Sequence, residues 1–229
     1  MTTISANLQA VHARIETAAR ACGRAPETVG LLAVSKTWPA SSVREAAMAG
    51  QRAFGENYVQ EGIDKIREVA RPDLEWHFIG PLQGNKTRQV AETFDWVHSV
   101  DRLKIAERLA QQRPETLPPL QVCLQVNISG EDTKSGVAPQ EAPALAQRIA
   151  QLPRLALRGL MAIPAPAADF AGQREPFRRL RQLFEQLVRE GLALDTLSMG
   201  MSNDIEAAIA EGATLVRVGT AIFGERNRS

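Results

Sequence analysis

Several features are scarce in this 229-residue sequence, and each scarcity excludes some classes of protein. The two cysteines, Cys22 and Cys123, show neither CxxC nor Cys/His metal-ligand spacing, so we expect a reduced, cytoplasmic protein. Basic and acidic residues nearly balance, at 27 and 26, which gives no electrostatic reason to expect nucleic acid or an anionic membrane as partner. The sequence has no continuous apolar stretch of the kind that forms a signal peptide or a membrane span. This composition favours a soluble protein with a small-molecule partner.

The sequence also lacks a Ser/Gly-rich linker, a low-complexity tract and a block of charge, so we expect one domain over residues 1–229. After an amphipathic helix at residues 4–22, strand-like and helix-like patterns alternate to the end. Such alternation is typical of βα units around a parallel sheet, and the count is close to eight. The pattern therefore predicts an α/β fold, a single (β/α)8 TIM-type barrel with an extra N-terminal helix.

The expected elements follow from short strand-like runs and from apolar residues at helical spacing. Strands are expected at residues 30–35, 52–55, 75–80, 96–99, 120–127, 156–163, 196–199 and 214–219. Helices are expected between them at residues 41–49, 59–69, 86–92, 102–112, 139–151, 176–189 and 204–211. Pro39 suits a first helical turn, and Gly50 suits a left-handed C-terminal cap.

Polar residues that end these strands are the candidates for a site, because the C-terminal rim of a parallel barrel is where side chains converge on a ligand. They are Lys36, Asn57, His77, Asn127, Ser202, Arg217 and Thr220. Two long irregular stretches, residues 129–138 and 164–172, also follow strands and are either lids or solvated loops. Closure of the barrel would bring its first and last strands together, so that Lys36 and Arg217 face one small site.

Lys36 follows the apolar run LLAVS, and desolvation beside apolar walls favours the neutral amine that attacks a carbonyl. The alternative is a strand-end lysine that reaches solvent. Arg217 lies in a strand buried on both faces, and a guanidinium in that position requires an acceptor. That acceptor is either a ligand or a buried carboxylate.

Glycines and hydroxyls follow the seventh and eighth strands, in SMGMSND and VGT. Gly219 lets the backbone approach a ligand closely, Ser202 and Thr220 add hydroxyl donors, and a helix beginning near Asp204 directs N–H groups outward. This is a phosphate cup in the place where barrels usually have one. The alternative is that Ser202 or Asn203 merely caps the next helix, a role that is compatible with phosphate binding.

Two further candidates remain open. His77, in EWHFIG, either lines the site or is a hydrogen-bonded core residue. Asn57, in FGENY, either donates to a ligand oxygen or caps the following helix.

These motifs together closely resemble a known family over essentially the whole chain. The segments that carry the resemblance are AVSK (33–36), FGENY (54–58), HFIGPLQGNK (77–86), VNI (126–128), KSG (134–136), GLM (159–161), LSMGMS (197–202) and RVGTAIFG (217–224). They resemble the pyridoxal-phosphate homeostasis proteins, the YggS/PROSC family. The resemblance implies a barrel like the N-terminal domain of alanine racemase, with pyridoxal 5′-phosphate (PLP) held as a Schiff base on Lys36. It also implies that Arg217 addresses the pyridine nitrogen, while Ser202, Gly219 and Thr220 hold the phosphate.

The function that we expect is a PLP-binding protein that buffers or carries the cofactor, with PLP-dependent enzymes as recipients, rather than an enzyme with turnover. No residue is assigned as catalytic or as a metal ligand, and we expect a monomer. The chain ends nine residues after Thr220, in a tail that we expect to be solvated, so we expect it to lack the second domain of alanine racemases. Its only tyrosine, Tyr58, has no argued place on the opposite face of a substrate. A PLP-dependent racemase-like enzyme remains the alternative, and a Schiff-base aldolase that uses Lys36 ranks third.

Overall fold

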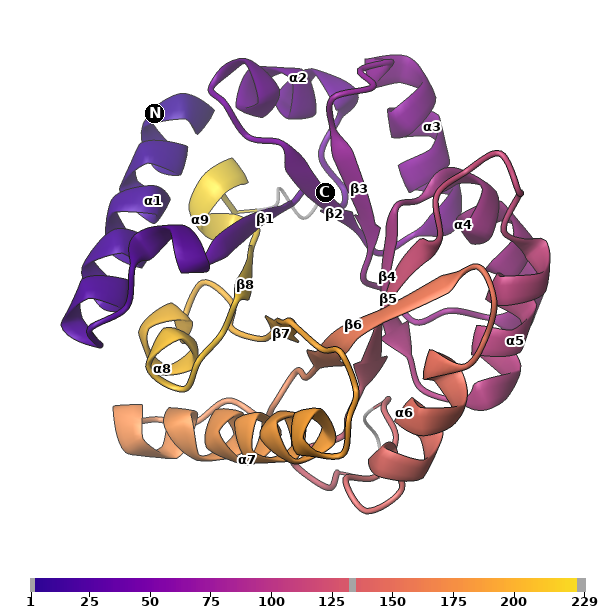
Figure 1. Cartoon of the computed structure of the whole chain (residues 1–229). Coiled ribbons are helices and arrows are strands. Elements are labelled where there is room, and N and C mark those ends of the chain that lie inside the picture. The colour runs from indigo at the N-terminus through magenta and orange to yellow at the C-terminus, as the bar shows by residue number, and fades with distance from the viewer. Residues whose placement is uncertain (1–2, 132–134, 226–229) are drawn as a thin grey trace.

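The structure, a computed structural model, describes residues 3–131 and 135–225. Its parallel strands close into a barrel in which each strand pairs with the next along the chain and β8 returns to β1. The strands are β1 (Gly30–Val34), β2 (Ala53–Glu56), β3 (Glu75–Phe78), β4 (Trp96–Val100), β5 (Leu120–Gln125), β6 (Leu155–Met161), β7 (Thr196–Ser198) and β8 (Leu215–Val218). All eight expected strands are present, and the (β/α)8 prediction is confirmed (Figure 1).

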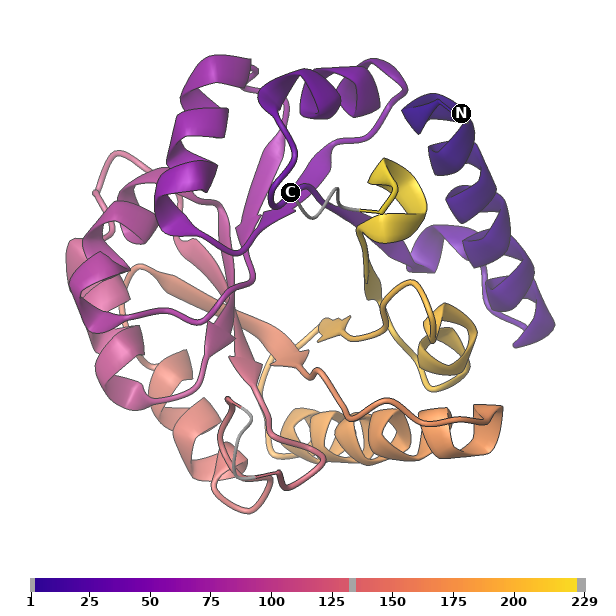
Figure 2. The ribbon, with the colours of Figure 1, turned by 180° about the vertical axis from the view of Figure 1, so that it is seen from behind.

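Helices form a ring outside the barrel (Figures 1 and 2). They are α1 (Ile4–Ala21), α2 (Ala40–Met48), α3 (Val59–Val69), α4 (Thr87–Thr93), α5 (Leu103–Gln112), α6 (Ala142–Ala150), α7 (Phe170–Arg189), α8 (Ile205–Ala210) and α9 (Thr220–Phe223), with 3-10 helices at Pro26–Thr28 and Gly84–Lys86. The N-terminal helix and the seven helices between strands were expected, whereas α9 was not. No helix in the described part of the chain is both long and apolar enough to cross a membrane.

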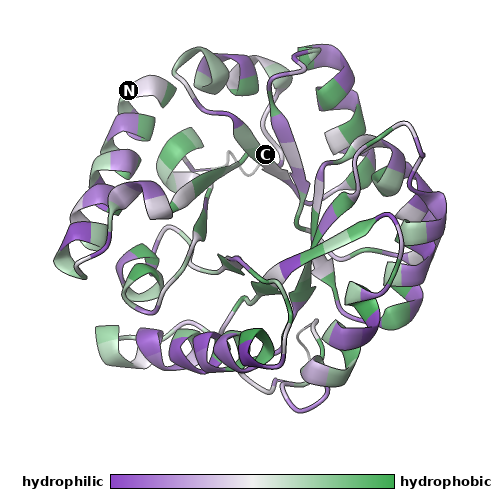
Figure 3. Ribbon diagram, in the orientation of Figure 1, coloured by the Kyte–Doolittle hydropathy of each residue, from purple (hydrophilic) through white to green (hydrophobic). Residues whose placement is uncertain are grey.

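The main core lies between the strands and the helices, because each helix turns an apolar stripe toward the sheet (Figure 3). In α5 the buried residues are Ile105, Ala106, Leu109 and Ala110, which is a helical repeat. The strands alternate, so that Val97 packs in this layer while Trp96 and His98 face the barrel interior. The interior is thus a separate region, and it includes polar groups as well as a small apolar cluster.

Two helix starts differ from their predictions. α7 begins at Phe170 rather than at residue 176, because the Asp169 side chain accepts a hydrogen bond from the Gly172 amide and caps an earlier start. Pro176 lies inside this helix. Pro39 is the N-cap of α2 rather than a residue of its first turn, whereas Gly50 adopts the expected left-handed conformation, with φ of 102°.

The helix α1 is attached to the last elements of the barrel (Figure 2). Asn7 Nδ2 donates to the carbonyl oxygen of Ile222 in α9 at 2.8 Å. Arg14 forms an ion pair with Glu206 of α8 and donates to the Ser202 carbonyl oxygen at 2.7 Å. The N-terminal helix therefore supports the loops that follow β7 and β8.

Candidate functional site

A cavity of about 420 Å³ opens at the C-terminal ends of the strands, a size that suits a small-molecule ligand. Five of the seven strand-end candidates line it, namely Lys36, Asn57, Ser202, Arg217 and Thr220, together with the expected Gly219. These residues follow β1, β2, β7 and β8 or lie within β8, so closure of the barrel brings together positions separated by most of the chain. Asn127 does not line the cavity.

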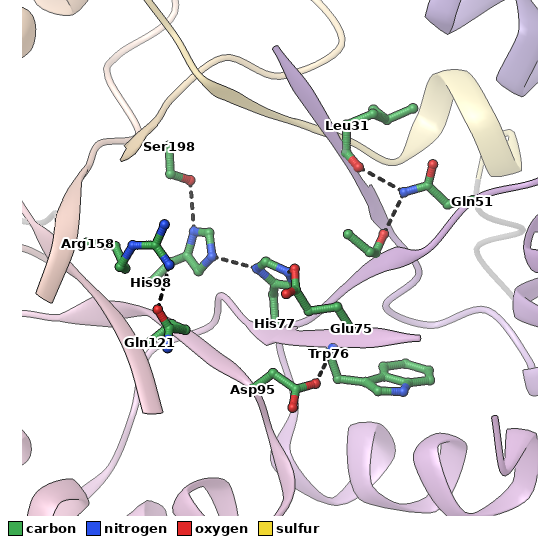
Figure 4. Close-up of polar contacts among 11 residues, drawn as sticks. Leu31, Gln51, Glu75, Trp76, His77, Asp95, His98, Gln121, Arg158 and Ser198 are labelled. Atoms are coloured by element: carbon green, nitrogen blue, oxygen red, sulfur yellow. Dashed lines mark hydrogen bonds and ion pairs between the residues drawn. The ribbon is translucent and has the colours of Figure 1, made fainter. Parts of the chain in front are cut away.

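His77, for which the sequence left two roles open, does not line this cavity. Its imidazole is buried in the barrel interior, with Nε2 2.7 Å from Glu75 Oε1 and Nδ1 2.9 Å from His98 Nε2 (Figure 4). Because side chains alternate along a strand, the position before Phe78 faces inward, but it lies below the rim that a ligand reaches. The reading of His77 as a hydrogen-bonded core residue fits the structure.

Arg217 is buried, lines the cavity and forms no ion pair in the described part of the chain. Its Nη1 donates to the Ser198 carbonyl oxygen at 2.6 Å and to Ser198 Oγ at 2.8 Å, and its Nη2 donates to the Ala162 carbonyl oxygen at 2.9 Å. Burial lowers the pKa of Arg217 to about 10, which still leaves the group charged at neutral pH. A guanidinium has five N–H donors, so donors remain for a ligand.

The residues on either side of Lys36 are held by α3. Lys65 Nζ donates to the Ser35 carbonyl oxygen at 2.6 Å, and the Thr37 amide donates to the Glu61 carboxylate. Thr37 has a φ of 68°, a conformation that a β-branched residue rarely adopts. The turn that presents Lys36 is therefore strained and is kept in place by contacts with its neighbours.

A buried charge cluster lies directly behind this turn. The Glu56 carboxylate accepts from Lys65 Nζ at 2.7 Å and from Ser35 Oγ at 2.6 Å. Burial raises the pKa of Glu56 despite its contact with Lys65. The sequence analysis did not identify this cluster, although Glu56 ends a predicted strand and Lys65 interrupts the apolar face of a predicted helix.

Unused donors converge where a phosphate was expected. The backbone N–H groups of Ser202, Asn203 and Gly219 make no hydrogen bond within the described residues. The hydroxyl-bearing residues Ser202 and Thr220 lie on the same cavity wall. A Cβ atom at Gly219 would lie 3.2 Å from the Val34 carbonyl oxygen, so the close approach of β8 to β1 favours glycine there. The wall thus gathers several unused N–H donors and two hydroxyl groups, which suits an anion.

The Asn57 side chain supplies another unused polar atom, because its buried Oδ1 has no partner among the described residues. The Asn57 backbone packs closely against Gly80, because a Cβ atom at Gly80 would lie 2.1 Å from the Asn57 carbonyl oxygen. Asn57 is the residue before the N-cap of α3, and no side-chain cap is formed at that helix. The geometry thus favours a ligand contact over a capping role.

Other lining residues were not expected. Apolar walls come from Trp38, which stacks on Phe223, and from the exposed side chains of Ile163 and Met201. Asp204 adds a carboxylate whose Oδ1 accepts from the Met201 amide, and burial raises its pKa. Lys134, from the KSG segment, lies outside the described residues, as do residues 132–133 of the first long loop and residues 226–229 of the expected tail.

Comparison with known proteins decides the family. Residues 6–227 match the family described as "Alanine racemase, N-terminal domain". The pyridoxal phosphate homeostasis protein of Pseudomonas aeruginosa is 64% identical to the chain, covering 99% of this chain and 97% of that protein. The chain belongs to this family. The protein of the same name from Escherichia coli strain K12 is 58% identical over 100% of this chain and 99% of its own length.

A solved member of this family has a closely similar structure. PipY of Synechococcus elongatus, whose structure contains PLP, has a TM-score of 0.85 and 40% identity, covering 97% of this chain and 100% of that chain. The alanine racemase of Corynebacterium glutamicum has a TM-score of 0.71 at 16% identity, covering 97% of this chain and 62% of the racemase. The latter similarity concerns the barrel fold alone.

Proposed function

We propose that this chain binds PLP through Lys36 and serves intracellular PLP homeostasis as a buffer or carrier. The observation that carries the proposal is one cavity in which Lys36 lies with a charged arginine and a wall of unused N–H donors. PLP carries an aldehyde, a pyridine nitrogen and a phosphate, and these need an amine, a polar partner and an anion site. The P. aeruginosa and E. coli relatives carry the name of PLP homeostasis proteins.

Each group of the cavity has a role in this proposal. Lys36 supplies the amine for a Schiff base with the aldehyde, and Arg217 donates to the pyridine nitrogen. The amides of Ser202 and Gly219, with the Thr220 hydroxyl, bind the phosphate. The amide of Asn57 contacts a polar atom of the ring. PLP supplies, when bound, the electron-withdrawing ring that activates amino acids.

The same residues favour storage over turnover. Arg217 can only donate, so it does not protonate the ring nitrogen and leaves the ring a weaker electron sink. Among the described lining residues only Lys36, Asp204 and Arg217 ionise. Racemisation needs a second acid or base opposite the lysine, but Tyr58 is 57% exposed and is not part of the lining. We therefore infer a PLP-binding protein without an efficient amino-acid reaction.

Further parts of this proposal concern the setting of the protein. We propose that residues 1–229 form one domain, that the protein is a cytoplasmic monomer and that PLP-dependent enzymes receive its PLP. The open cavity, with Ile163 and Met201 exposed at 39% and 38%, supports an exchangeable ligand.

Binding is tested by titrating purified protein with PLP and recording its visible absorbance. Wild type and Lys104→Ala, which removes an exposed lysine on α5, should develop the same band, whereas Lys36→Ala should not. Equal bands in all three proteins would refute the role of Lys36.

Turnover is tested by exchange of the α-proton of amino acids in heavy water. We expect no exchange above that of free PLP across a broad panel of amino acids. Exchange that Lys36→Ala abolishes would instead establish the racemase-like alternative.

A further inference from the structure

A chain of hydrogen bonds runs through the barrel interior from Arg217 to Glu75. Ser198 Oγ, which accepts from Arg217 Nη1 at 2.8 Å, lies 2.8 Å from His98 Nδ1. His98 Nε2 lies 2.9 Å from His77 Nδ1, and His77 Nε2 lies 2.7 Å from Glu75 Oε1 (Figure 4). The chain thus joins four strands, β8, β7, β4 and β3.

The two ends of this chain allow only one arrangement of protons when both imidazoles are neutral. Arg217 only donates, and an ionised Glu75 only accepts. The hydrogen bond from His77 lowers the pKa of Glu75, which keeps it ionised. His77 therefore donates from Nε2 and accepts at Nδ1, His98 does the same, and the Ser198 hydroxyl donates to His98. Ser198 Oγ then presents its lone pairs to Arg217.

The surroundings favour a neutral imidazole at His98. His98 is buried, and burial together with nearby His77 and Arg217 lowers its pKa well below the usual value. Burial likewise raises the pKa of the neighbouring Cys123 thiol to about 12, so that group is neutral too. Arg217 is a buried cation. Within the described residues its hydrogen bonds go to the Ser198 hydroxyl and to the carbonyl oxygens of Ser198 and Ala162, and not to a carboxylate.

We propose that Glu75, His77, His98 and Ser198 form a proton-ordered relay that positions Arg217, with His98 and Ser198 as positioning residues for the ligand at Arg217. The relay fixes the rotamer of the guanidinium and leaves its remaining donors directed at the cavity. The statement that the relay positions Arg217 for a ligand rests on the proposed PLP function. The exposed end is Glu75, whose side chain is 51% exposed at the start of β3.

The proton order is tested directly by nitrogen NMR of unliganded protein with ¹⁵N-labelled histidine. The chain has three histidines, and His12→Asn assigns the exposed one on α1. At about pH 7.5 we expect His77 and His98 both to be protonated at Nε2 and not at Nδ1. A proton on Nδ1 of either ring, or a charged imidazole, would overturn the relay.

The positioning role is tested with matched serine variants. Ser198→Ala removes the acceptor of Arg217, whereas Ser99→Ala removes a buried hydroxyl on β4 that has no partner among the described residues. We expect Ser198→Ala to bind PLP about tenfold more weakly and to shift its absorption band, Ser99→Ala to bind like wild type, and Ser198→Thr to recover binding. Equal affinities for Ser198→Ala and Ser99→Ala would contradict the positioning role.

The two proposals fail in different ways. A wild-type protein that binds no PLP would refute the proposed function, while the histidine spectra of the unliganded protein still decide the relay. Thermal melting of each variant identifies any general loss of folding.

Discussion

Lys65 Nζ lies 2.6 Å from the carbonyl oxygen of Ser35, the residue before Lys36. The same ammonium contacts Glu56 and Glu61 at 2.7 and 2.6 Å. A helix outside the described cavity lining therefore fixes the turn that presents Lys36 to the cavity. Such support suits a strained turn, because the neighbouring Thr37 would otherwise relax.

Replacing Lys65 should destabilise the fold. Lys65→Met leaves the fully buried Glu56 carboxylate without its cation, and breaking a buried pair typically costs about 3–5 kcal/mol. Urea unfolding measures this loss. Lys104→Met, on the exposed face of α5, is the matched control and should change stability by less than about 0.5 kcal/mol. Equal losses in the two variants would show that the buried cluster contributes nothing special.

The cavity should also respond to a methyl group added at Gly80. The new Cβ would lie 2.1 Å from the Asn57 carbonyl oxygen, and backbone atoms cannot yield as a side chain can. We expect Gly80→Ala to destabilise the protein by about 3 kcal/mol and to weaken PLP binding because Asn57 moves. Gly84→Ala is the control, since its Cβ would meet only the Arg108 side chain, at 3.1 Å. A Gly80→Ala protein as stable as Gly84→Ala would disprove the close contact.

Stability should fall in acid through His98. Its pKa in the folded protein is well below the usual 6.5, so between the two values the unfolded chain binds the additional proton. The contribution is present above pH 6.5 and is lost as the pH falls, with a slope of at most about 1.4 kcal/mol per pH unit. Urea unfolding from pH 8 to 5.5, both values chosen for the test, should show a steeper loss in wild type than in His98→Asn. His12→Asn should follow wild type, and identical slopes in all three would place the titration elsewhere.

The sequence was most informative where pattern and structure are both local. The helix Val59–Val69 has the bounds that its apolar repeat predicts, and each strand was recognised from a short strand-like run. The start of α7 was missed because Pro176 has a strong preference for first turns, and the earlier cap by Asp169 competes with it. Asp169 and Pro176 are each suited to the beginning of a helix, so local propensity alone cannot decide between the two starts.

The candidate site was predicted because strand ends of a closed barrel must converge. Lys36 and Arg217 could be paired from the fold class alone, whereas the partners of Arg217 could not. Whether Ser198 or a carboxylate meets the guanidinium depends on the stagger between strands, and the sequence does not state it. The role of His77 was left open for the same reason, since its inward direction was predictable but its depth was not.

Arg14 shows a different limit of the sequence. It borders the apolar stripe of α1, formed by Leu8, Val11 and Ile15, so a contact with the barrel was a possible inference. Its partners, Glu206 and the Ser202 carbonyl oxygen, lie about 190 residues away along the chain, at sequence separations of 192 and 188. Pairings of this length follow only from the assembled fold.

The most direct measurement maps the bound cofactor. Purified protein is saturated with PLP, reduced with borohydride, digested and analysed by mass spectrometry. The added mass should lie on the peptide that contains Lys36, and Lys36→Ala should carry no label at that position. Label confined to another lysine, or spread equally over all five lysines of the chain, would contradict the account.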